Sequence, residues 1–75
     1  MYKIKEIIQT CMACPSQWSG TTTDNEEIYI RFRWGILSVR IEDKVIFEEQ
    51  ISKDSLDGVI SLDKVLKHTK NILER

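Results

Sequence analysis

The chain has 75 residues, 41% hydrophobic and 31% charged, which is typical of one globular domain over residues 1–75 and excludes a disordered chain. Eleven basic residues against twelve acidic ones leave a net charge of -1, which excludes a general electrostatic attraction to nucleic acid or acidic membranes. No apolar run approaches the roughly 20 residues of a membrane span, and residues 1–10 lack the apolar stretch of a signal peptide, so we expect a cytoplasmic protein.

The first segment has the period of an amphipathic helix. Its apolar residues recur at spacings of three and four, at Ile4, Ile7, Ile8, Cys11 and Met12. A proline follows at position 15, and it stops such a helix because its ring removes an N–H and disfavours helical angles in the residue before it. We therefore predict a first helix over residues 3–13.

The middle of the chain alternates apolar and polar residues with the period of two that a β-strand has. This alternation predicts strands over residues 28–34, 36–41 and 45–51, with a tight turn between the last two. The threonine-rich residues 17–23 end at an Asp-Asn turn and are a candidate fourth strand. The prediction is therefore an antiparallel meander of three or four strands.

The end of the chain returns to a helical period. Ser61 is the predicted N-cap of this helix, and Asp63 suits its first turn. One face is lined by Val65, Leu66, Thr69, Ile72 and Leu73. The expected fold class is α+β in two layers, in the order helix, three- or four-stranded meander, helix. Both helices would cover one face of the sheet, and the other face would meet water or a partner.

The two cysteines, Cys11 and Cys14, have the C-x2-C spacing of half a zinc knuckle. The other half is missing, since His68 is the only histidine, and a metal shared across a dimer is the alternative that remains. A redox pair belongs at a helix N-terminus, and a cysteine nucleophile needs a base and an orienting group. We expect instead that Cys11 and Trp18 join the core, with no cofactor and no enzymatic activity.

Two motifs suggest a resemblance. The string CPSQW-x-G at residues 14–20 is followed by Y-x-R-x-R-W-G-x-L-S at residues 29–38. Together they resemble uncharacterised small proteins of bacteria and phages, over about a third of the chain. The resemblance implies that both motifs belong to one architectural unit, and it implies no particular activity. By analogy with phage-borne proteins, an anti-CRISPR-like inhibitor of a host defence enzyme is an alternative function.

The arginine-rich strand is the main functional candidate. If its apolar residues face the helices, Tyr29, Arg31 and Arg33 share the opposite face, and Arg40 of the next strand has the parity to join them. Trp34 has the parity of the core, but the glycine that follows it can break that parity and bring Trp34 to the rim of the open face.

Three interpretations of this surface are open. Arginine and tyrosine are enriched at protein interfaces, while basic and aromatic residues on an antiparallel sheet also bind single-stranded RNA. Nearby glutamates could instead pair with the arginines and neutralise them, at about 0.2–1 kcal/mol for each pair. We predict a small non-enzymatic protein, an inhibitor or adaptor, that binds a protein partner, with a homodimer as one option. The predicted contact residues are Tyr29, Arg31, Arg33, Trp34 and Arg40.

Overall fold

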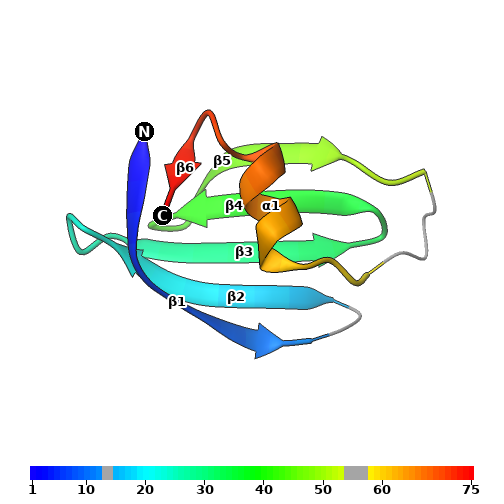
Figure 1. Ribbon diagram of the computed structural model, residues 1–75, viewed down its shortest axis with the longest axis horizontal. Coiled ribbons are helices and arrows are strands. Elements are labelled where there is room, and N and C mark those ends of the chain that lie inside the picture. The colour runs from blue at the N-terminus through cyan, green and yellow to red at the C-terminus, as the bar shows by residue number, and fades with distance from the viewer. Residues whose placement is uncertain (13–14, 54–57) are drawn as a thin grey trace.

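A computed structural model describes residues 1–12, 15–53 and 58–75. Within these ranges the chain forms a six-stranded sheet that curls into a half-barrel around one short helix (Figure 1). The strand order is β5-β4-β3-β2-β1-β6, and every pairing is antiparallel except that of β1 with β6. The elements are β1 (Tyr2–Cys11), β2 (Ser16–Thr22), β3 (Glu27–Arg33), β4 (Ile36–Ile41), β5 (Lys44–Gln50), α1 (Leu62–His68) and β6 (Leu73–Glu74).

The predicted helix over residues 3–13 is wrong, because this segment is strand β1. Its pairing with β2 is irregular between Ile4 and Glu6 and again between Gln9 and Cys11. An extra residue at such a bulge reverses the alternation of side chains, so Ile4 and Ile7 both reach the core although they are three residues apart. This spacing imitates a helix, while the β-branched isoleucines themselves favour a strand.

The predicted meander is confirmed. Residues 28–34, 36–41 and 45–51 correspond to β3, β4 and β5 with small shifts at their ends, and the candidate fourth strand forms as β2. The β3–β4 and β4–β5 connections are two-residue turns, Trp34–Gly35 and Glu42–Asp43, in which every φ is positive. Paired positive φ values are the mark of the type I′ turns that join antiparallel strands tightly.

The two-helix, two-layer fold class is wrong, because one short helix covers the sheet and the chain then adds a sixth strand. Ser61 is the N-cap as predicted, since its hydroxyl accepts from the Lys64 N–H at 3.3 Å. The helix ends at His68, and in the turn that follows it the N–H groups of Ile72 and Leu73 both donate to the Thr69 carbonyl, at 2.9 and 2.8 Å. That turn releases Leu73 to pair with Tyr2 of β1. No helix in the described ranges is long and apolar enough to span a membrane.

The core lies between the sheet and α1. Most of it comes from alternate positions of the neighbouring strands β3 and β4, and α1 adds Val65. The prediction that Trp18 enters the core is confirmed, because only 2% of its surface is exposed. The buried apolar residues are Ile4, Trp18, Ile28, Ile30, Phe32, Leu37, Val39, Ile41, Val65 and Leu73.

Gly20 is the point at which β1 bends across β2. It pairs with Ile7, and a Cβ at Gly20 would overlap the carbonyl oxygen of Glu6 and lie 2.9 Å from the Ile7 Cα. Only glycine lets the two backbones come this close. Beyond the bend, the first residues of β1 turn over the core toward β6, which brings the two ends of the chain to the same side of the sheet (Figure 1).

Ser16 ties the start of β2 to the segment before α1. Its side chain is fully buried; the hydroxyl donates to the Met12 carbonyl at 2.8 Å and accepts from the Ile60 N–H at 3.3 Å. Its own N–H donates to the Gly58 carbonyl at 2.9 Å. The serine of the CPSQW motif therefore has a structural role in this fold.

Candidate functional site

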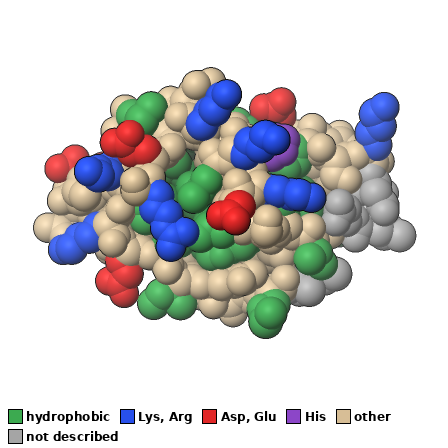
Figure 2. All heavy atoms as spheres, viewed as in Figure 1, with side chains coloured by type: hydrophobic (Ala, Val, Ile, Leu, Met, Phe, Trp, Pro, Cys, Tyr) green, Lys and Arg blue, Asp and Glu red, His purple; other side chains and the backbone are tan. Residues whose placement is uncertain are grey.

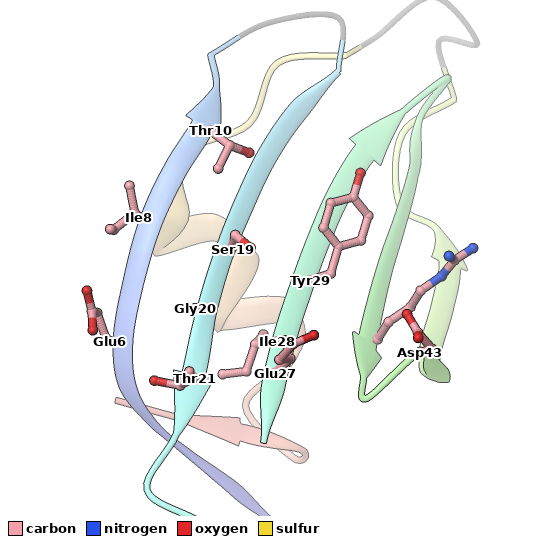
Figure 3. A pocket seen from close by; sticks show the side chains of 11 residues that line it. Glu6, Ile8, Thr10, Ser19, Gly20, Thr21, Glu27, Ile28, Tyr29 and Asp43 are labelled. Atoms are coloured by element: carbon pink, nitrogen blue, oxygen red, sulfur yellow. The ribbon is translucent and has the colours of Figure 1, made fainter. Parts of the chain in front are cut away.

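The predicted contact residues lie on the face of the sheet opposite α1, which we call the open face. On β3, the side chains of Ile28, Ile30 and Phe32 are at most 2% exposed. Those of Tyr29, Arg31 and Arg33 alternate with them and are half-buried on the other side of the sheet. Figure 3 looks onto the open face, with α1 behind the sheet. The uncovered arginine face that the alternation of β3 predicts is therefore present.

Strand register brings the arginines together. Tyr29 pairs with Arg40, and Arg31 pairs with Ser38 in the next antiparallel row. Four of the five predicted residues line one shallow hollow of about 190 Å³, and Tyr29 lies just outside it. The hollow is lined by Arg31, Arg33, Trp34, Ile36, Ser38, Arg40 and Glu48.

Trp34 lies at the tip of the β3–β4 hairpin and not in the core. Its φ is 56° and that of Gly35 is 75°, so the turn breaks the alternation and carries the indole outward, with 54% of Trp34 exposed. The Arg33 guanidinium stacks on the indole, 4.3 Å from the ring centroid. Trp34 thus joins the rim of the open face, as the alternative interpretation of the following glycine predicts.

The arginines of the open face are not neutralised by the glutamates near them in sequence. Within residues 1–12, 15–53 and 58–75, no carboxylate lies within the 4.0 Å of an ion pair from Arg31, Arg33 or Arg40. Glu48 comes closest in register, because it pairs with Ser38, the cross-strand partner of Arg31. The cross-strand ion pairs that the sequence suggests are therefore absent from this surface.

A second and larger hollow occupies the other half of the open face (Figure 3). Its volume is about 550 Å³, and the small residues Ser19, Gly20 and Thr21 of β2 lie between taller side chains of β1 on one side and of β3 on the other. Sequence reasoning missed this hollow. The Ser-Gly-Thr run indicates it in retrospect, once β2 is known to lie between β1 and β3.

The open face is electrically polarised. Three carboxylate residues, Glu6, Glu27 and Asp43, line the larger hollow, whereas the smaller hollow contains three arginines and Glu48. Arg40 borders both hollows. The opposite side of the molecule differs, because basic and acidic side chains are interspersed over it (Figure 2).

The candidate metal and redox residues do not form a described site. Cys14 lies outside the described residues, and Cys11 is half-buried at the end of β1. His68 is exposed at the end of α1, on the other side of the sheet. In the described part of the chain, no three histidine, cysteine, aspartate or glutamate side chains come together in a way that could hold a metal ion.

No protein-family model matches the chain, and neither a curated protein nor a solved structure matches it. The resemblance of the two motifs to bacterial and phage-borne proteins therefore stays a prediction.

Proposed function

We propose that this small protein is a non-enzymatic binding protein that captures a protein partner through its open face. The contact is centred on the stacked pair of Arg33 and Trp34 at the hairpin tip. The observation that carries the proposal is that a large aromatic residue occupies a left-handed turn position while half of its surface faces solvent.

This position of Trp34 is costly for the fold. A left-handed conformation costs an L-residue with a bulky side chain about 1–2 kcal/mol, and asparagine or glycine is preferred at this place in a hairpin turn. The indole gains little burial in return, because 54% of the residue is exposed. Strain of this kind concentrates at functional sites, and tryptophan and arginine dominate the centres of protein interfaces.

The chemistry of the surface indicates the chemistry of the partner. Three arginines that form no ion pair with any described carboxylate favour an acidic partner, because a guanidinium binds a carboxylate through two parallel hydrogen bonds. Trp34 and Ile36, which is 38% exposed, offer apolar surface beside them. We therefore expect a protein segment that places acidic side chains over the smaller hollow and an apolar side chain against the indole.

A single-stranded nucleic acid suits this face less well. Its phosphates would be attracted by the arginine end but repelled at the other end, where Glu6, Glu27 and Asp43 line the larger hollow. The net charge of -1 supplies no compensating long-range attraction. The polarity of the face therefore favours a protein, which can present both signs of charge.

Affinity capture from a native lysate tests the proposal. Wild-type protein, the variant Arg31→Glu with Arg33→Glu, and Trp34→Asn are each immobilised, and the retained proteins are identified by mass spectrometry. Lys64→Glu with Lys67→Glu makes the same change in charge on α1 and is the matched control. We expect one protein to be retained by the wild type and the control, and lost from both open-face variants. A partner that all four proteins retain equally would exclude the open face as the interface.

A further inference from the structure

We propose that a second copy of this chain is a partner of the open face. The basic end of β3 in one copy, with Arg33, lies against the acidic end of β3 in the other, with Glu27, and the contact is made twice. This inference rests on the proposed function, because it names the protein that the same surface binds.

The charge on the open face changes sign along β3. Its open-face residues run Glu27, Tyr29, Arg31 and Arg33, from carboxylate to guanidinium. Register extends the acidic end sideways, since Glu27 pairs with Thr21 and Thr21 with Glu6. Two identical faces that meet with their strands reversed therefore place opposite charges against each other.

This match of charges is reciprocal between the two copies. A twofold axis that crosses the strands between Tyr29 and Arg31 puts Glu27 of each copy against Arg33 of the other. The same rotation places each Tyr29 against an Arg31, which is a cation–π arrangement. On the neighbouring strand it places Arg40 over Ser38, beside Glu48, the one acidic residue of the smaller hollow. Glu27 and Arg33, which form no ion pair within the described residues of one chain, thereby gain an oppositely charged partner.

The size of the face sets the expected affinity. Four strands about 4.8 Å apart, each with about six residues at 3.3 Å, cover roughly 400 Å² on each copy, and the curl of the sheet allows no more than this area to come into contact. Stable complexes bury about 800 Å² on each partner, so the dimer should be weak. We expect a dissociation constant in the micromolar range or above, which makes the dimer sensitive to concentration and salt.

Sedimentation equilibrium tests this inference, with samples from about 1 µM to about 1 mM. The wild type should show a monomer–dimer equilibrium. Arg33→Glu makes both ends of the face acidic and Glu27→Lys makes both ends basic, so each variant alone should dimerise at least about tenfold more weakly. Their equimolar mixture should recover the wild-type affinity, because every charge pair across the interface is then of opposite sign. The control Lys64→Glu with Lys67→Glu should dimerise like the wild type.

Three results would overturn the second copy as the partner. They are a wild type that stays monomeric throughout, a dimer that neither single variant weakens, and association that continues beyond the dimer. A monomeric wild type that still captures another protein through Arg31, Arg33 and Trp34 would refute this inference and leave the proposed function standing. Conversely, a dimer rescued by mixing the two variants supports the inference even if the lysate yields no other partner.

Discussion

Replacing Gly20 with alanine should cause a large loss of stability, because the close crossing of β1 and β2 has no room for a side chain. The added Cβ meets backbone, the Glu6 carbonyl and the Ile7 Cα, and backbone cannot rotate away as a flexible side chain can. The strand must shift, and its first residues then lose their place over the core. Ile4 and Leu73, which are 7% and 2% exposed, would be uncovered together.

The size of the effect follows from that burial. Covering an isoleucine or leucine side chain is worth about 1.5–3 kcal/mol, so uncovering these two costs about 3–6 kcal/mol. A domain of this length has a total stability of only about 4–11 kcal/mol. At about 4–8 °C for each kcal/mol, the Gly20→Ala protein should melt at least about 12 °C below the wild type, or fail to fold.

Urea unfolding followed by tryptophan fluorescence measures this effect, since Trp18 is buried in the folded protein. The neighbouring Ser19→Ala is the control, because Ser19 is an exposed residue of the open face and should change the free energy of unfolding by no more than about 0.5 kcal/mol. In a strand without a close contact, alanine would instead stabilise by about 0.4–1 kcal/mol, through the unfolded chain. If the Gly20→Ala protein were at least as stable as the wild type, β1 and β2 could not lie this close together at Gly20.

Three further changes test other features by the same unfolding assay. Trp34→Ala keeps the left-handed turn and loses the stack with Arg33, so it should lower the free energy of unfolding by about 0.5–1 kcal/mol. Trp34→Asn should be about 1 kcal/mol more stable than Trp34→Ala, because asparagine tolerates left-handed angles. Equal stabilities of these two variants would contradict the turn geometry. Ser16→Ala should cost about 1–3 kcal/mol, because the partly buried N–H of Ile60 loses its acceptor, and a neutral result would argue against that bond. Ile8→Thr should change the free energy of unfolding by less than about 0.5 kcal/mol, since Ile8 is 59% exposed. A large loss would instead indicate that Ile8 is buried, as in the helix that the spacing of apolar residues predicts.

The sequence predicts the central strands well because β3 and most of β4 are regular. Their alternation has no bulge between Glu27 and Val39, so parity alone assigns every side chain to a face. The same parity predicts correctly that Tyr29, Arg31 and Arg40 share the open face. It fails at Trp34, where two consecutive positive φ values interrupt the strand, and a positive φ at tryptophan is not expected from its residue type.

The outer elements could not be predicted from local pattern. Bulges in β1 convert a period of two into spacings of three, and the resulting order of apolar residues is the same as that of a helix. Strand β6 has two residues, too few for any period, and it exists because β1 offers it an edge. The larger hollow depends on which strands are neighbours, and β2 shows only as a run of small residues until its place between β1 and β3 is known.

The pairing of Tyr2 with Leu73 has a consequence for the order in which the protein assembles. Strands β2 to β5 are connected by short turns and can zip together from local contacts, whereas the β1–β6 contact must close a loop that spans almost the whole chain. We therefore expect strands β2 to β5 to form early and the pairing of β1 with β6 to form last. Until β1 pairs with β6, Ile4 and Leu73 do not cover their side of the core, which stays open to water. A nascent or clipped chain would be most prone to aggregate through that exposed side.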